Sequence, residues 1–328
     1  KMTDKEVLTS RLVDRALRPL FPDKFFQQIQ ILSTVYSVDK ENMPDMLALV
    51  SCSLALTLSK IPFFGPVGAV EIGFVDGEWI VNPTYSQAQK SSSRLVIAGT
   101  EDGICMLEGC TDSISEKQLL DILDLAHQKI KTLIDWQVRV AAEFGCEKME
   151  IPNTFDWQQW EDKAAAFFTP DRLKSICNLG NKEQRSQAIR ELHEAFMQQY
   201  KDEIGEDSVV IKKTRYALDS QFKTSFTDFV LNEKYRIDGR KFDEIRDITS
   251  EVGILPFTHG SAVFTRGETQ ALVTTTLGTG QDVQRTEELM GDTVDKKFIL
   301  HYNFPPFSTG EAKPMRGPGR REVGHGAL

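Results

Sequence analysis

The segment ITSEVGILPFTHGSAVFTRGETQALVTTTLG (residues 248–278) decides the fold class of the C-terminal part of this chain. Apolar and polar residues alternate in it with a period of two, which is typical of half-buried strands. Arg266-Gly267 separates two such runs, so the pattern predicts a hairpin with Val263, Ala271 and Val273 facing a core. KKFILHYNF (296–304) predicts a further strand.

Immediately upstream, helix signals replace strand signals between about residues 155 and 232. Thr169-Pro170 has the form of an N-cap followed by proline at the first helical position, and Gly180 and Gly205 are stop signals. The stretch between these two glycines carries apolar residues at helical spacing. This part of the chain is predicted to be a small all-helical domain.

The N-terminal part mixes both kinds of element. Asp76-Gly77 and Asp102-Gly103 each lie between alternating apolar arms and predict two hairpins. QIQILSTVYSVD (28–39) predicts a half-buried strand, and MPDMLALVSCSLALTLSK (43–60) a buried helix.

Two capping boxes mark the helices at the beginning and end of that part. Thr3 and Glu6 begin an opening helix, and Ser115 and Gln118 begin a long amphipathic helix that ends at Gly145. Both ends of the chain interrupt apolar helical patterns, so we expect a piece of a longer polypeptide.

The composition is that of an ordinary globular protein: 328 residues, 40% hydrophobic and 27% charged, with a net charge of −9. The negative charge argues against a protein that coats nucleic acid over its whole surface, although basic residues outnumber acidic ones near both ends. Five cysteines without a CxxC pair favour buried thiols in a reducing cytoplasm over zinc or disulfides. No apolar run is long enough to predict a membrane span, and no secretory leader is seen.

PGRREVGHGAL (318–328) is the first candidate site. The planar forks of Arg320 and Arg321 match phosphate oxygens, and His325 can donate a hydrogen bond or move a proton near neutral pH. The surrounding glycines would let the backbone approach a bound anion closely. The alternative is a solvated basic pair followed by a histidine satisfied in the core.

Two further arginine clusters are candidates for binding a polyanion. Arg11, Arg15 and Arg18 fall on one face of the opening helix, from which Asp14 is expected to point away. Arg240 lies in RIDGRKFDEIR (236–246). The alternative there is a loop in which Asp238-Gly239 makes a turn and the arginines pair with Asp243 and Glu244.

The aromatic residues of HYNFPPFSTGE (301–311) could stack bases, although Pro305-Pro306 can simply end a strand. No Walker loop, GxGxxG, HExxH or nucleophile elbow is present, and no convincing pair of metal-binding carboxylates. The residues alone therefore indicate a mixed α and β protein with basic ends that suit phosphate.

Six stretches, taken in order, closely resemble the bacterial polynucleotide phosphorylase family. They are SRLVDRALRPLFP (10–22), VDGEWIVNPT (75–84), RIDGRKFDEIR (236–246), LPFTHGSAVFTRGETQALVTTTLGT (255–279), FILHYNFPPFSTGE (298–311) and GRREVGHGAL (319–328). The resemblance implies an α+β fold in which two RNase PH-like cores, of the ribosomal protein S5 domain 2-like kind, flank an all-helical domain. Domains are then expected at 1–150 (later part of core one), 151–232 (helical) and 233–328 (opening part of core two).

The resemblance also implies an activity. In this family, phosphate attacks the 3′-terminal phosphodiester of RNA and releases nucleoside diphosphates, and the reverse reaction is untemplated polymerisation. Arg320 and Arg321 match the pair that holds phosphate and the RNA end, and His325 matches an active-site position. Arg240 and Arg18 match arginines linked to activity and RNA handling. Mg²⁺ is the implied cofactor, with ligands expected beyond residue 328.

Single-stranded RNA, phosphate and nucleoside diphosphates are the implied partners, in a cytoplasmic protein that is a homotrimer at full length. We expect the isolated chain to be inactive, because phosphoryl transfer needs the metal's charge. The alternative is a non-catalytic RNase PH-like ring subunit that binds RNA. One departure from the family pattern is Phe257, which stands where arginine is usual and removes one possible phosphate contact.

Overall fold

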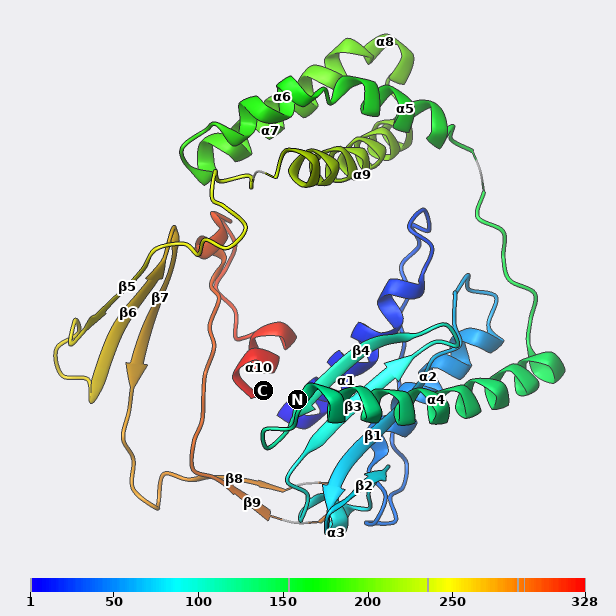
Figure 1. Ribbon diagram of the computed structural model, residues 1–328, viewed down its shortest axis with the longest axis vertical. Coiled ribbons are helices and arrows are strands. Elements are labelled where there is room, and N and C mark those ends of the chain that lie inside the picture. Colours follow the sequence, from blue (N-terminus) through cyan, green and yellow to red (C-terminus); the bar gives the residue numbers. More distant parts are fainter. Residues whose placement is uncertain (1, 153, 235, 288, 292, 328) are drawn as a thin grey trace. The chain divides into compact units, whose positions relative to one another are not determined.

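The computed structural model describes residues 2–152, 154–234, 236–287, 289–291 and 293–327. The fold is α+β, and the chain forms two compact units (Figure 1). One unit comprises Lys1–Ile151 with Thr279–Leu328, and the other comprises Pro152–Gly278. The predicted domains 1–150, 151–232 and 233–328 divide the chain in three and stay a prediction.

The first unit is built on an antiparallel sheet with the strand order β2-β1-β3-β4. Its helices are α1 (Asp4–Leu17), the 3₁₀ turn η1 (Arg18–Leu20), α2 (Pro44–Leu58), α3 (Tyr85–Ala88) and α4 (Glu116–Phe144), and its strands are β1 (Gly68–Val75), β2 (Glu78–Val81), β3 (Arg94–Gly99) and β4 (Ile104–Cys110). The C-terminal segment adds β8 (Gln284–Glu287), β9 (Thr293–Lys296), the 3₁₀ turn η2 (Pro306–Thr309) and α10 (Arg320–Ala327).

Helices cover both faces of this sheet, because side chains along a strand alternate between its faces. Val70 and Ile72 of β1 pack with the buried face of α4, in a cluster that includes Ile130. Ala69, which precedes Val70 and faces the opposite side, packs with α2 and α1 in a cluster that includes Leu49. Strand β1 is therefore buried on both sides, and the sheet is a rigid middle layer.

The predicted turns and caps of this unit are confirmed. Asp76 and Gly77, with φ of 51° and 87°, join β1 to β2, and β3 pairs with β4 around Asp102-Gly103. The capping boxes of Thr3 with Glu6 and of Ser115 with Gln118 are formed, and α4 ends at Gly145 as predicted.

Two predicted strands are absent from the structure. Residues 28–39 and 297–304 form no strand. In the first segment Ile29 and Ile31 do pack on the core, which explains the alternation. A strand also needs a neighbour for its N–H and C=O groups, and the described main chain supplies none for either segment.

The second unit contains the predicted all-helical segment. Its helices are α5 (Trp157–Phe167), α6 (Pro170–Cys177), α7 (Lys182–Gln199), α8 (Lys201–Ile204) and α9 (Ser208–Glu233). Thr169 and Pro170 begin α6, and Gly205, at φ 69°, follows the end of α8, as predicted. The core is rich in aromatic rings, with Phe196 completely buried next to Trp160 and Phe167.

The same unit carries a sheet of β5 (Ile248–Val252), β6 (Gly260–Arg266) and β7 (Thr269–Thr275). The predicted hairpin is confirmed, since Arg266 pairs with Thr269 across a turn in which Gly267 has a φ of 58°. The expectation that Val263, Ala271 and Val273 face a core is wrong for Ala271 and Val273, which are exposed, whereas Val263 is half-buried. Alternation selects one face of a strand but does not supply the layer that covers it.

Among the described residues, no helix is long and apolar enough to cross a membrane.

Candidate functional site

The short helix α10 carries two of the predicted site residues, Arg320 and Arg321, in its first turn. The carbonyl of Gly319 accepts the N–H of Val323 at 3.0 Å and so begins the helix. A helix start leaves N–H groups unsatisfied and carries a partial positive charge, which favours anions. Both arginines are exposed, and within the described residues no carboxylate pairs with either.

Helix α10 lies against α1, as Figure 1 shows with α10 in red beside the blue α1. A guanidinium nitrogen of Arg320 donates to the hydroxyl of Ser10 at 3.4 Å. The stem of Arg11 lies against Gly324, where an added β-carbon would be 2.5 Å from its Cδ and Nε atoms. The structure thus brings Arg11 of one cluster to the helix that carries Arg320 and Arg321.

The glycines around His325 serve this packing. A β-carbon at Gly326 would meet the carbonyl oxygen of Leu300, and one at Gly324 would meet Arg11. The expectation that they make room for an anion is therefore corrected: at these two positions the space is filled by the protein itself. Close approach of the backbone is the reason for glycine here.

His325 is exposed, which removes the alternative of a histidine satisfied in the core. Its ring lies 5.1 Å from that of Tyr302, centroid to centroid. The rings of Tyr302 and Phe304 are 6.3 Å apart and nearly parallel, with 11° between their planes. Exposed aromatic faces next to a histidine and two arginines form a surface that could accept planar rings together with phosphates.

The other two arginines of this cluster, Arg15 of α1 and Arg18 of η1, are paired with acids. Arg15 forms an ion pair with Glu108 of β4. Arg18 donates to both oxygens of Asp14, at 3.2 and 2.5 Å. The expectation that Asp14 points away is wrong, because residues four apart on a helix are neighbours. Only Arg11 of the three lies at α10.

Arg240 lies in the second unit. Its Nε donates to Asp238 at 2.9 Å, and another guanidinium nitrogen donates to the carbonyl of Glu244 at 2.8 Å. Burial alone would raise the pKa of Asp238, but the hydrogen bonds from Arg240 keep that pKa below its ordinary value. Arg240 is thus bonded within its own loop, although its partners are Asp238 and a main-chain carbonyl and not the carboxylates of Asp243 and Glu244.

Sequence reasoning missed Glu322. One carboxylate oxygen accepts the N–H of Gly319 at 2.7 Å, and the other accepts the N–H of Phe304 at 2.6 Å. These two bonds, the first being the stronger influence, lower the pKa of Glu322. The signal was available, because Glu322 follows Gly319 at the spacing at which Glu6 follows Thr3.

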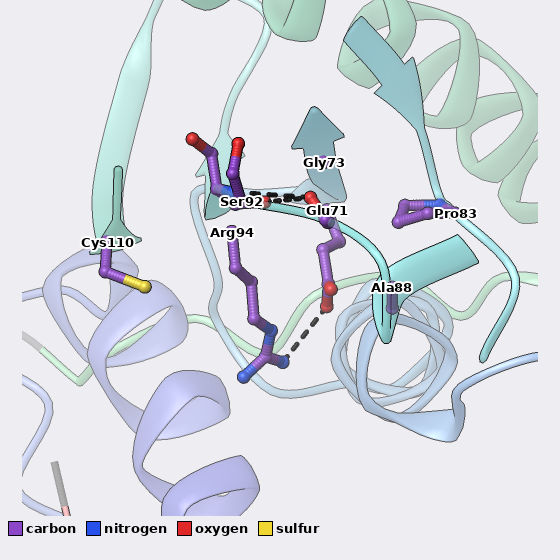
Figure 2. Close-up of a pocket in the computed structure, with 9 residues that line it drawn as sticks. Glu71, Gly73, Pro83, Ala88, Ser92, Arg94 and Cys110 are labelled. Atoms are coloured by element: carbon purple, nitrogen blue, oxygen red, sulfur yellow. Dashed lines mark hydrogen bonds and ion pairs between the residues drawn. The ribbon is translucent and has the colours of Figure 1, made fainter. Parts of the chain in front are cut away.

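Sequence reasoning also missed a small cavity in the first unit. Arg94 of β3 lines a cavity of about 80 Å³ together with Ser91, Ser92, Ser93 and Cys110 (Figure 2). Its guanidinium bonds the buried carboxylates of Glu71 at 3.0 Å and Asp45 at 3.4 Å. Burial opposes a rise in the pKa of Arg94, but these acids raise it above its ordinary value. A guanidinium paired with two buried carboxylates holds its neighbours in place, and little of its charge remains to attract an anion.

No group of three or more His, Cys, Asp or Glu residues able to hold a metal ion lies in the described part of the chain. These residues therefore do not form a ligand set that fits the implied Mg²⁺.

Comparison with known families gives two matches. The model of the 3′ exoribonuclease family, domain 1, matches residues 1–62 and 244–328, and the model of domain 2 of that family matches residues 65–129. Domain 1 thus covers the ends of the chain that carry α1 and α10. Domain 2 covers the four-stranded sheet and about the first half of α4.

Curated relatives align with almost the whole length of this chain. The polyribonucleotide nucleotidyltransferase of Syntrophomonas wolfei is 42% identical over 328 residues, which are 100% of this chain and 46% of that protein. Those of Bacillus velezensis and Bacillus subtilis are each 44% identical over 326 residues, 99% of this chain and 46% of theirs. The chain spans about half the length of the curated relatives it matches.

Proposed function

Because the chain belongs to the 3′ exoribonuclease family, we propose that it is part of a phosphate-dependent 3′-to-5′ exoribonuclease that releases nucleoside diphosphates from RNA. The reaction is reversible, and the reverse direction is untemplated RNA polymerisation. Three relatives named polyribonucleotide nucleotidyltransferase, similar over nearly the whole chain, support this activity for the full-length protein.

One observation supports the position of the site. Arg320 and Arg321 are exposed at the start of α10 and free of carboxylate partners among the described residues, whereas Arg15, Arg18 and Arg240 are each bonded to an acid. A guanidinium without a carboxylate partner retains its attraction for an anion. We infer that Arg320 and Arg321 bind the attacking phosphate and the 3′-terminal phosphodiester, with Arg11 beside them.

The chemistry requires such a site. Charge builds up on the equatorial oxygens of the transferring phosphoryl group, so fixed guanidinium groups lower the barrier by stabilising that charge. We propose that His325, four residues after Arg321 on the same helix, donates a hydrogen bond to the same oxygens or to the departing ribose oxygen. Tyr302 and Phe304 offer exposed ring faces on which the terminal bases can stack without regard to sequence.

Mg²⁺ belongs to the proposal as a cofactor that would neutralise phosphate charge, with ligands expected beyond residue 328. The isolated 328-residue chain is then inactive, because its own residues supply only the anion-binding half of the site. We further propose that the full-length protein is a cytoplasmic homotrimer. Sedimentation of the full-length protein tests the trimer.

The activity is tested with the full-length protein and poly(A). We expect ADP to be released when phosphate and Mg²⁺ are both present, and not when phosphate is left out. Release that does not depend on phosphate would contradict the proposal. Binding of poly(A) without any ADP would favour the alternative, a non-catalytic ring subunit.

A further inference from the structure

The carboxylate of Glu322 ties together two segments that are far apart in the sequence. One oxygen accepts the N–H of Gly319, at the start of α10, at 2.7 Å. The other accepts the N–H of Phe304 at 2.6 Å, at the end of residues 300–304, which we call the aromatic stretch. Bonds between an ionised carboxylate and main-chain N–H groups are about twice as strong as neutral ones. One side chain therefore fixes where the aromatic stretch lies relative to the helix that carries the arginines.

Within the described residues, Glu322 forms no ion pair with the two arginines beside it in the sequence. A glutamate beside two arginines would ordinarily pair with one of them, as Glu108 does with Arg15. Each oxygen of Glu322 accepts one N–H group, and no ion pair between Glu322 and Arg320 or Arg321 is formed in the described chain. The positive charge of the pair is left for a ligand.

The aromatic stretch has no other regular support from the main chain. Residues 297–304 belong to no strand, so no sheet ladder holds Tyr302 and Phe304 in place. The bond from Phe304 to Glu322, the packing of Gly326 against Leu300 and the ring contact of Tyr302 with His325 connect this stretch to α10. Losing the first of these would let the stretch move relative to the arginines.

We propose that Glu322 is a positioning residue, which holds the aromatic stretch of Tyr302 and Phe304 and the arginines of α10 in one fixed arrangement for the phosphate and the RNA end. The inference rests on the proposed function of the same site. Ionisation of Glu322 is favoured by the N–H groups that it accepts, in line with the direction of its pKa.

The chain offers a matched control. Glu6 follows its cap residue Thr3 at the same spacing, is followed by valine as Glu322 is, and accepts the main-chain N–H of Thr3 at 2.6 Å. Its carboxylate caps α1 and reaches no aromatic stretch. A loss that comes only from weaker helix capping should therefore be the same for Glu6→Gln as for Glu322→Gln.

The test measures steady-state phosphorolysis of a short oligoadenylate by the full-length protein. We expect Glu322→Gln to raise the KM for phosphate and the KM for RNA by about tenfold to a hundredfold, because a small displacement of binding groups has effects of this size. Glu6→Gln should leave both KM values unchanged. A purely structural role would lower the fraction of active enzyme, and thus the apparent kcat, without raising either KM.

A second measurement does not depend on activity. Amide hydrogen exchange in wild type and in Glu322→Gln should show faster exchange at Phe304 and Gly319 in the variant, since a glutamine has one acceptor oxygen for the two N–H groups. Unchanged KM values together with unchanged exchange would overturn the inference. If wild type releases no nucleoside diphosphate, the proposed function fails, and the exchange result still decides whether Glu322 holds the two segments.

Discussion

Gly324 of α10 lies so close to Arg11 of α1 that an added β-carbon would be 2.5 Å from the guanidinium Nε. This contact places an arginine from the beginning of the chain at the helix that carries Arg320 and Arg321 near its end. It is the reason that the proposed site combines the two segments matched by the domain 1 family model.

The two glycines beside His325 should tolerate substitution unequally. Gly324→Ala meets the flexible side chain of Arg11, which can move aside, whereas Gly326→Ala meets the backbone carbonyl of Leu300. Overpacking against backbone typically costs about 1–3 kcal/mol. We expect Gly326→Ala to release α10, seen as faster amide exchange over residues 320–327, and Gly324→Ala to raise mainly the KM for RNA.

Gly317→Ala is the control for this pair, because an added β-carbon there meets nothing within 4 Å. Equal exchange rates in Gly326→Ala and Gly317→Ala would show that the close approach to Leu300 does not hold α10.

The paired arginines Arg15 and Arg18 should matter little for turnover. Arg15 and Arg18 are exposed and already bonded to Glu108 and Asp14, and such surface pairs contribute about 0–1 kcal/mol to stability. We therefore expect Arg15→Ala and Arg18→Ala to change kcat/KM for phosphate by less than about fivefold. A loss as large as that of Arg320→Ala would show that these charges reach the ligand after all.

The aromatic pair should affect RNA and not phosphate. Removing a ring on which a base stacks costs about 1–3 kcal/mol per base. Tyr302→Ala in the full-length protein should raise the KM for a short oligoadenylate accordingly, while the KM for phosphate stays within about twofold of wild type. A rise confined to the KM for phosphate would exclude the stacking role.

The helical segment should lose stability as the pH falls below neutrality. His193 packs between the rings of Phe168 and Phe222, and burial lowers its pKa from the ordinary 6.5, with Asp219 acting in the opposite direction. The unfolded chain then binds the proton more readily, so stability is present above about pH 6.5 and declines below it.

Amide exchange of α7 and α9 at pH 7.5 and 5.5 measures this dependence, after correction for the intrinsic effect of pH on exchange. His193→Phe should flatten it, because the titrating group is gone and the apolar packing is kept. A variant that keeps the full wild-type dependence would assign it to another group.

Much of the fold could be predicted from local sequence signals. Capping boxes such as Thr3 with Glu6, and Asp-Gly turns such as Asp76-Gly77, depend on neighbours only a few residues apart, and they are present as expected. Residues 28–39 and 297–304 were predicted wrongly, because a strand depends on a partner far away in the sequence. The exposure of Val273 has the same origin.

The candidate site shows the same division. From residue chemistry alone, arginine and histidine in GRREVGHGAL left two interpretations open, an anion site and a solvated basic pair. Which arginine is paired depends on tertiary contacts. The sequence does not show that Glu108 meets Arg15 from a strand 93 residues away, or that Glu322 meets Phe304. Placing Arg11 beside Gly324 likewise required the packing of two helices.

The most direct test of the central claim is kcat/KM for phosphate, measured for the full-length protein with Arg320 and Arg321 both changed to glutamine and compared with Arg15→Gln. Removing a fixed donor from a phosphoryl-transfer site typically costs about a hundredfold or more. The account predicts at least that loss for the double variant and nearly wild-type turnover for Arg15→Gln. Wild-type kcat/KM for phosphate in the double variant would contradict it.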